Sequence, residues 1–156
     1  MLLKEICTPD VVLCTPNTRV LAAARMMRHS HVGDLVVVED PEGDQTPFGI
    51  VTDRDIVIEV LGKELDPSKV TVAEIMRKPA VIASESEDIS QAIERMKAHG
   101  VRRIPVMGAH RKLTGIIALD DLVRRLAADA AALASVTAAA KPLDPQLLRL
   151  ARVLAQ

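Results

Sequence analysis

The apolar positions along the chain follow the same order of patterns twice. Each time, a short apolar run is followed by polar residues and then by apolar residues at helical spacing. The short runs predict strands at 11–13 and 80–82, and the helical faces comprise Val20, Ala23, Ala24 and Met27, then Ile89, Ala92, Ile93 and Met96. Two more strand-like runs follow in each half, and a helix from about Asp53 or about Leu119 closes it. The pattern predicts a β-α-β-β-α unit that occurs twice.

An internal repeat supports this prediction. At an offset of 69 positions Val12-Leu13 matches Val81-Ile82, and "VGDLVVV" matches "VRRIPVM". The offset then falls to 66, where "GIVTDRDI" matches "GIIALDDL". The change lies in "EDPEGDQTP", whose Gly, Pro and Asp residues indicate a loop that tolerates length differences. Because the strand-like runs "LVVVE", "FGIVT", "IPVM" and "TGIIA" are almost continuously apolar, we expect an α/β (α+β) fold in which helices cover the sheets.

Less regular segments separate and follow the two units. We expect the first unit at residues 1–62, a linker at 63–72, the second unit at 73–128 and a helical C-terminal extension at 129–156. A Thr-x-x-Glu capping box predicts a short helix from about Thr71. In the tail, Val123, Leu126, Ala130, Leu133 and Thr137 lie at helical spacing, "KPLDP" breaks the helix, and "QLLRLARVLAQ" predicts a last amphipathic segment. This tail packs on its own domain, contacts a second copy or partner, or is disordered.

Composition narrows the function classes. The 156 residues are 49% apolar and 26% charged, and the net charge of −1 gives no general attraction to nucleic acid or anionic lipid. Phe48 is the only aromatic residue, so stacking on single-stranded nucleic acid is not expected. Cys7 and Cys14, with no signal-peptide pattern and no run long enough to span a bilayer, favour a reduced, cytoplasmic protein. Together with His29 and His31 they match no zinc spacing, and no catalytic motif points to an enzyme.

The stretch "GIVTDRDIV" has two interpretations. Thr52 and Asp55 lie three positions apart at a strand-to-helix junction, which is the spacing of a capping box. The junction also suits a ligand, because free amides at a helix N-terminus bind phosphate and a nearby carboxylate accepts ribose hydroxyls. Capping and ligand binding can coexist. The second copy, "GIIALDDLV", keeps Asp121 but has Ala118 in place of the threonine.

The duplicated unit, with "GIVTDRDI", "VGDLVVVED" and "VRRIPV", resembles a tandem pair of cystathionine β-synthase (CBS) domains, a Bateman module, over residues 1–128. The resemblance implies two units packed sheet to sheet with pseudo-twofold symmetry. It further implies a stand-alone sensor, commonly a disc-shaped homodimer, that binds AMP, ADP, ATP or S-adenosylmethionine in a cleft and signals to a partner protein. No required cofactor and no catalysis are implied. The alternative is a nucleotide-independent dimerisation or interaction module with degenerate sites.

The resemblance also assigns residues to a first ligand site. Thr52 would lie at the phosphate, and Asp55 would hold the ribose. Arg54, between them, either pairs with the phosphate or points to solvent. Asp53 belongs to the same turn. Apolar walls and backbone groups for the adenine would come from Val11, Val12, Val32, Gly33 and Asp34.

A second, weaker site is implied in the other half. It would comprise Asp121, Ala118, Ala80, Val81, Arg102 and Arg103. Ala118 lacks the hydroxyl, and losing one hydrogen bond to a charged group costs about 1.5–3 kcal/mol, or roughly tenfold to a hundredfold in affinity. Because the two sites share a central cleft, the arginines serve either the ligand at Asp55 or their own site, or they form a solvated cluster at the helix exit.

Overall fold

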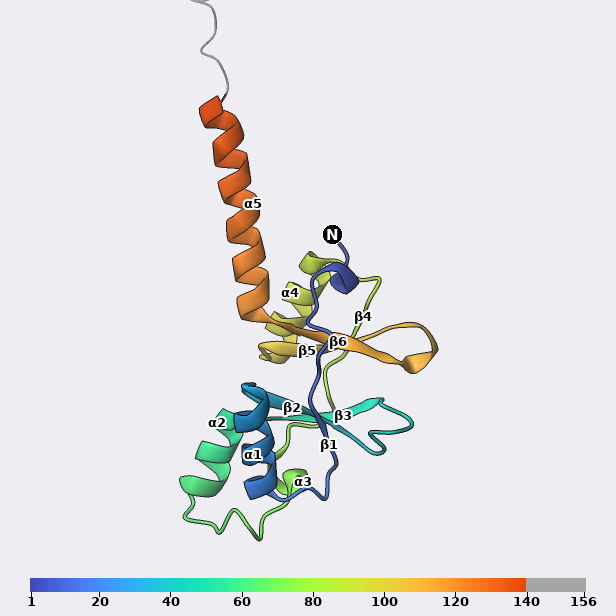
Figure 1. Ribbon diagram of the computed structural model, residues 1–156, viewed down its shortest axis with the longest axis vertical. Coiled ribbons are helices and arrows are strands. Elements are labelled where there is room, and N and C mark those ends of the chain that lie inside the picture. The colour runs from blue at the N-terminus through green and yellow to red at the C-terminus, as the bar shows by residue number, and fades with distance from the viewer. Residues whose placement is uncertain (140–156) are drawn as a thin grey trace, which may run out of the picture. The chain divides into compact units, whose positions relative to one another are not determined.

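The computed structural model describes residues 1–139 (Figure 1). The first half comprises β1 (Leu13–Cys14), α1 (Val20–Ser30), β2 (Asp34–Val38), β3 (Pro47–Thr52) and α2 (Asp53–Ile56), which continues as the π-helix η2 (Val57–Leu61). The second half comprises β4 (Ala83–Ser84), α4 (Ile89–His99), β5 (Arg103–Met107), β6 (Leu113–Ala118) and α5 (Leu119–Ala139). The short helices η1 (Leu3–Glu5), α3 (Val72–Ile75) and η3 (Ala109–Arg111) complete the described chain. The predicted β-α-β-β-α order is confirmed in both halves.

The first strand of each half begins later than the apolar pattern predicts. β1 occupies 13–14 rather than 11–13, and β4 occupies 83–84 rather than 80–82. The parallel ladder to β2 includes only Leu13 and Cys14. Val11 lies before the strand and packs against the cluster between the two sheets. The residues of the two apolar runs are only partly buried, or exposed in the case of Ile82, and the runs did not show where the hydrogen-bonded ladder starts.

Each half forms a three-stranded sheet with the same topology. β1 pairs with β2 in parallel and β2 pairs with β3 antiparallel, and β4, β5 and β6 repeat this order. A register irregularity recurs near the end of β2 and near the end of β5. Local chemistry sets the helix ends. Asp88 caps α4 by accepting from the Gln91 amide at 2.9 Å, and Gly100 ends that helix in the left-handed conformation.

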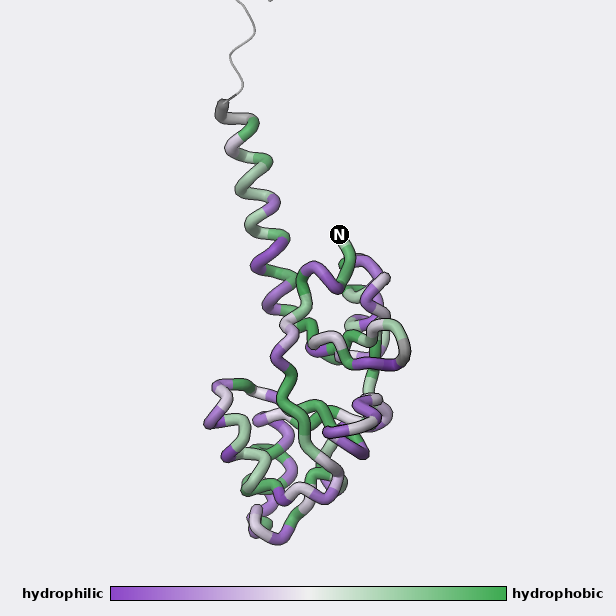
Figure 2. Tube along the Cα trace, turned by 45° about the vertical axis from the view of Figure 1, so that its right-hand side comes forward, coloured by the Kyte–Doolittle hydropathy of each residue, from purple (hydrophilic) through white to green (hydrophobic). Residues whose placement is uncertain are grey.

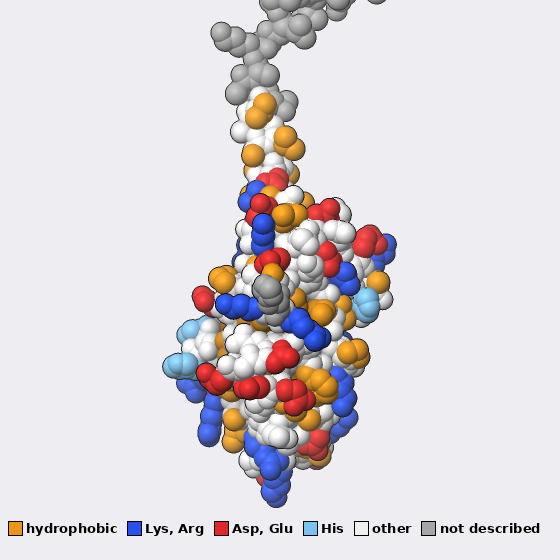
Figure 3. All heavy atoms as spheres, turned by 90° about the vertical axis from the view of Figure 1, so that its right-hand side faces the viewer, with side chains coloured by type: hydrophobic (Ala, Val, Ile, Leu, Met, Phe, Trp, Pro, Cys, Tyr) orange, Lys and Arg blue, Asp and Glu red, His pale blue; other side chains and the backbone are white. Residues whose placement is uncertain are grey.

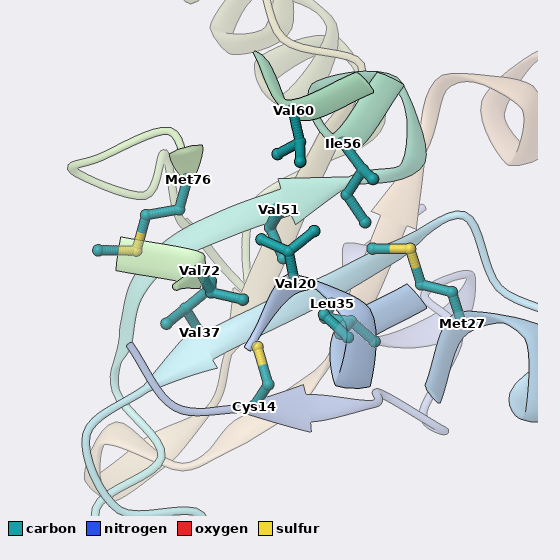
Figure 4. Packing of buried hydrophobic residues seen from close by; sticks show 11 residues of the cluster. Cys14, Val20, Met27, Leu35, Val37, Val51, Ile56, Val60, Val72 and Met76 are labelled. Atoms are coloured by element: carbon teal, nitrogen blue, oxygen red, sulfur yellow. The ribbon is translucent and has the colours of Figure 1, made fainter. Parts of the chain in front are cut away.

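Helices cover the outer face of each sheet, and the inner faces meet. In the first half α1, α2 and α3 lie on one side of the sheet, and their side chains meet those of the strands in the cluster drawn in Figure 4. Fully buried members of that cluster include Val20, Leu35, Val37, Val51 and Val60. Val36, Val38 and Leu113 form the cluster between the two sheets. Figure 2 shows that strongly apolar stretches follow the strands. The predicted fold class, two α/β units packed sheet to sheet, is confirmed.

Two isolated β-bridges between the halves are related to each other by pseudo-twofold symmetry. Ile50 pairs with Arg77, and Thr8 pairs with Ile116. The repeat offsets of 69 and 66 convert one bridge into the other, since Thr8 matches Arg77 and Ile50 matches Ile116. The segment that precedes each half therefore runs along the sheet of the other half.

The same exchange of segments is seen in the two hydrophobic cores. Leu3 of η1 is buried in the core of the second half, whereas Val72 of α3 and Met76 are buried in the core of the first. The boundaries expected at 62 and 73 stay predictions about sequence units, because the packing units exchange these short segments.

Gly49 and Gly115 allow the exchanged segments to cross the sheets. A Cβ atom at Gly49 would lie 2.9 Å from the carbonyl oxygen of Arg77 and 2.9 Å from Met76 Sδ. A Cβ atom at Gly115 would lie 2.7 Å from the carbonyl oxygen of Thr8. The glycine at the start of "GIVTDRDI" and "GIIALDDL" is therefore required by a close backbone approach.

The predicted tail is helical as far as Ala139, the last residue that the structure describes. Residues 1–122 form one compact unit, and the rest of α5 belongs to a second unit that starts at Val123. Leu126, Leu133 and Val136 of α5 are exposed. The break predicted at 141–145 and the last helix predicted at 146–156 lie outside the described residues. Across residues 1–139, no helix combines the length and apolarity needed to cross a lipid bilayer.

Candidate functional site

The turn from β3 into α2 is held by a reciprocal set of hydrogen bonds. The amide and hydroxyl of Thr52 donate to Asp55 Oδ2 at 3.0 and 2.7 Å. Thr52 Oγ1 in turn accepts from the Asp55 amide at 3.2 Å. This is a capping box, so the capping interpretation of "TDRD" is confirmed.

The Asp55 carboxylate also joins this turn to the segment before β4. Among residues whose burial is described, it is the only polar or charged side chain that is buried, with 5% exposed. Its Oδ1 accepts from Arg77 Nε at 3.3 Å, and the Arg77 side chain remains 61% exposed. Both oxygens of the Asp55 carboxylate therefore have protein partners.

The equivalent turn from β6 into α5 keeps only part of this arrangement. The Ala118 amide donates to Asp121 Oδ2 at 3.2 Å. Ala118 has no hydroxyl, so it cannot reproduce the bonds that Thr52 makes through its side chain. The two turns are related by the repeat but differ in hydrogen-bonding capacity.

A cavity of about 570 Å³ lies where these turns approach each other. The first turn contributes Thr52, Asp53 and Arg54, and the second contributes Ala118, Leu119 and Asp120. The remaining walls come from Ile50 of β3, from Arg77, Pro79, Ala80 and Val81 before β4, and from Gly100, Val101, Arg102 and Arg103 around the start of β5. This volume is within the range of small-molecule sites in proteins.

The cavity combines residues that the sequence assigned to two separate sites. Of the first predicted site it includes Thr52, Asp53 and Arg54, and of the second it includes Ala80, Val81, Arg102, Arg103 and Ala118. Val11, Val12, Val32, Gly33, Asp34, Asp55 and Asp121 are not among its lining residues. Their proposed roles in ligand binding stay predictions. The geometry agrees with the expectation that the two arginines share a cleft with the Thr52 turn.

Ion pairs set the electrostatics of the cavity wall. Arg103 Nε lies 2.6 Å from Asp34 Oδ2, with the two side chains 32% and 14% exposed. Arg102 Nη2 lies 3.5 Å from Asp120 Oδ1, and both of these side chains are largely exposed. Burial raises the pKa of the Asp34 carboxyl above its ordinary value, Arg103 opposes this rise, and Asp53 adds to it. The Asp34–Arg103 pair joins the two halves directly beside the cavity.

Sequence reasoning missed Arg77 and Asp120 as cavity residues. Arg77 reaches the cavity because its backbone pairs with Ile50 of the other half. The usable signal was the repeat itself, which aligns Arg77 with Thr8 at the entrance to each half. Asp120 is the counterpart of Arg54 in the repeat, so its position follows once both turns are known to face one cavity.

Two further features lie apart from this cavity. A smaller hollow of about 400 Å³ between the hairpin loops is lined by Gly43, Asp44, Gln45, Arg111 and Lys112, and Figure 3 shows acidic and basic side chains on that face. Within the described part of the chain, no group of three or more His, Cys, Asp or Glu side chains is arranged to hold a metal ion.

Fold and cavity together define a class of protein: a tandem α/β repeat whose two units share one ligand-sized cavity. The family model of the CBS domain matches residues 3–62 and 72–128, and the chain belongs to the CBS domain family.

Relatives and solved structures agree with this assignment. The chain is 34% identical over 123 residues to Hypoxic response protein 1 of Mycobacterium tuberculosis, covering 79% of this chain and 83% of that protein. It is 30% identical over 120 residues to the uncharacterized protein MK0525 of Methanopyrus kandleri, but the match spans only 60% of that protein. The CBS domain pair of protein MJ0100, solved in complex with 5'-methylthioadenosine and S-adenosyl-L-methionine, superposes with a TM-score of 0.71 at 25% identity, covering 83% and 98% of the two chains.

Proposed function

We propose that this chain is a regulatory module that binds an adenosyl ligand in the cavity between its two halves and signals its occupancy to another protein. The observation that carries the proposal is the convergence of the Thr52 turn with Arg102 and Arg103 on one cavity of about 570 Å³. The adenosyl ligands found in the CBS pair of protein MJ0100 support the ligand class.

The cavity has the chemistry that such a ligand requires. Ile50, Pro79 and Val81 offer apolar contacts for an adenine ring. Arg54 and Arg102, both exposed, offer guanidinium donors for a phosphate or carboxylate. In this proposal Thr52 lies at the anionic group, and Asp55 keeps the turn and Arg77 in place. Contact of Asp55 or Asp121 with the ribose remains a prediction.

Differential scanning fluorimetry and calorimetric titration test the proposal. The panel is AMP, ADP, ATP, S-adenosylmethionine, 5'-methylthioadenosine and NAD. A ligand at about 100 times its Kd adds about 2.7 kcal/mol to the free energy of unfolding, which raises Tm by roughly 5–10 °C. A panel in which no compound stabilises or binds the protein would refute the proposal.

A variant pair separates binding at the cavity from binding elsewhere. Arg102→Ala removes a guanidinium that lines the cavity, and we expect it to weaken a ligand with an anionic group by about tenfold or more. Arg28→Ala removes a guanidinium on α1 that is also exposed but is not among the lining residues, and it should leave the affinity unchanged. Equal effects of the two substitutions would place the ligand outside the cavity.

The exposed apolar side chains of α5 support a second candidate function, a nucleotide-independent dimerisation or interaction module. Leu133 and Val136 are 71% and 68% exposed, which is unusual for two large apolar residues one turn apart on a helix. This candidate predicts a homodimer that forms without nucleotide and is lost on deletion of residues 129–156. Light scattering after gel filtration measures the molar mass of the full and truncated chains. A truncated chain that is still a dimer would contradict this candidate.

A further inference from the structure

The positive and negative side chains at the cavity are equal in number. The guanidinium groups that line it belong to Arg54, Arg77, Arg102 and Arg103. The carboxylates beside them are Asp55 on Arg77, Asp120 on Arg102, Asp34 on Arg103, and Asp53, which also lines the cavity. Four positive groups therefore lie among four negative ones. A site of this kind lacks the excess of positive charge that attracts a polyphosphate.

The ion pairs differ in how readily a ligand can open them. Arg102 and Asp120 are 3.5 Å apart with side chains 71% and 69% exposed, so water replaces the contact at little cost. Arg103 and Asp34 are 2.6 Å apart, and Asp34 is only 14% exposed. Opening this pair would leave a carboxylate that is mostly shielded from water without its partner. Arg102 is therefore available to a ligand, whereas Arg103 is held.

A second carboxylate, that of Asp53, lies in the neighbourhood of Arg103. An ideal Cβ atom at Gly33 would lie 3.2 Å from Asp53 Oδ2 and 3.4 Å from Arg103 Nη2, so both groups border the same glycine. The Asp53 amide is fixed there by donating to the Gly33 carbonyl oxygen at 3.0 Å. An anionic group that approached Arg103 would also approach Asp53.

We propose that Asp34 determines the ligand specificity of the cavity: by holding Arg103 it restricts the site to adenosyl ligands with at most one anionic group, and it disfavours nucleoside di- and triphosphates. The inference rests on the proposed function, because it concerns the same cavity. Arg102 and Arg54 accommodate a single phosphate or carboxylate. A longer phosphate chain needs Arg103 as well, and it meets Asp53 and Asp34 there.

Calorimetric titration of AMP, 5'-methylthioadenosine and ATP into the full chain and its variants tests this inference. In the unchanged protein we expect AMP to bind about tenfold or more tightly than ATP. Asp34→Asn keeps the side-chain shape but releases Arg103. We expect this substitution to raise the affinity for ATP, so that the ratio of the AMP affinity to the ATP affinity falls by about tenfold. The gain in ATP affinity should disappear in the double variant Asp34→Asn, Arg103→Gln. Asp44→Asn, in an exposed hairpin loop, is the matched control.

Asp53→Asn keeps the test decisive if Asp34→Asn fails to fold. Asp53 is exposed, and removal of its charge should lower the ratio of the AMP affinity to the ATP affinity by a smaller factor, about twofold to fivefold. If ATP binds the unchanged protein as tightly as AMP, or if neither substitution changes the ratio, the inference is overturned while the proposed function stands. If no adenosyl compound binds at all, both are overturned.

Discussion

Replacing Asp55 by alanine tests how far the Thr52–Asp55 turn is a structural element. The substitution removes the acceptor for the Thr52 amide and hydroxyl at 3.0 and 2.7 Å and the partner of Arg77. Loss of a helix cap costs about 1 kcal/mol, and loss of a hydrogen bond to a charged acceptor costs about 1.5–3 kcal/mol. The Arg77 side chain is 61% exposed, so water solvates it and adds little to the cost. We therefore expect a loss of about 2–4 kcal/mol.

Urea unfolding followed by far-ultraviolet circular dichroism measures this loss. For a chain of this length the same change lowers Tm by roughly 4–16 °C. Asp53→Ala is the matched control, because Asp53 lies in the same first turn but is exposed, and it should cost less than about 1 kcal/mol. Asp55→Asn should fall between the two, since the amide oxygen can still accept a hydrogen bond. If Asp55→Ala costs no more than Asp53→Ala, the structural role assigned to Asp55 is wrong.

Three further predictions concern other parts of the molecule. Gly49→Ala should destabilise the protein by about 2–4 kcal/mol in urea unfolding, because the methyl group would meet the Arg77 carbonyl oxygen and Met76 Sδ at 2.9 Å; a neutral or stabilising effect would contradict the crossing geometry. Burial raises the pKa of the Cys14 thiol to about 12, so in a Cys7→Ser variant Cys14 should resist Ellman's reagent at about pH 8 until urea unfolds the chain, whereas rapid labelling of the native protein would refute this. Burial also raises the pKa of Asp34 above its ordinary value of 3.8, so the stability that this shift contributes is complete below pH 3.8 and is lost as pH rises through the raised pKa. The difference in unfolding free energy between the unchanged protein and Asp34→Asn should therefore fall with rising pH. A difference that grows with pH would contradict the raised pKa of Asp34.

The order of elements could be predicted because it depends on local patterns that occur twice. Helical spacing from Val20 to Met27 and the apolar runs around Val36 and Ile117 each specify one element and its buried face. The start of β1 could not be predicted in the same way. Val11 is apolar because it packs between the sheets, whereas the ladder depends on where β2 places its partners.

The candidate site was predictable only in part, for a related reason. Thr52 and Arg54 share a turn with a recognisable local signature, so their place at the cavity could be predicted from one stretch of sequence. Arg77 reaches the cavity through a β-bridge between segments of different halves. Such a bridge depends on the exchange of the segments that precede each half, and no property of "MRKPA" alone indicates that exchange.

Divergence between the halves makes the two sides of the cavity chemically different. Asp34 and Arg103 occupy equivalent positions at the 69-residue offset of the repeat, and they meet in an ion pair at 2.6 Å. In an exact repeat the same residue would meet its own copy there, and two like charges at this distance would repel. Opposite charges convert the contact into a link between the halves. The same divergence places a hydroxyl at Thr52 and a methyl group at Ala118 on the two sides of the cavity. Duplication therefore supplied the paired turns, and the differences between the copies give the two sides of the cavity different hydrogen-bonding groups.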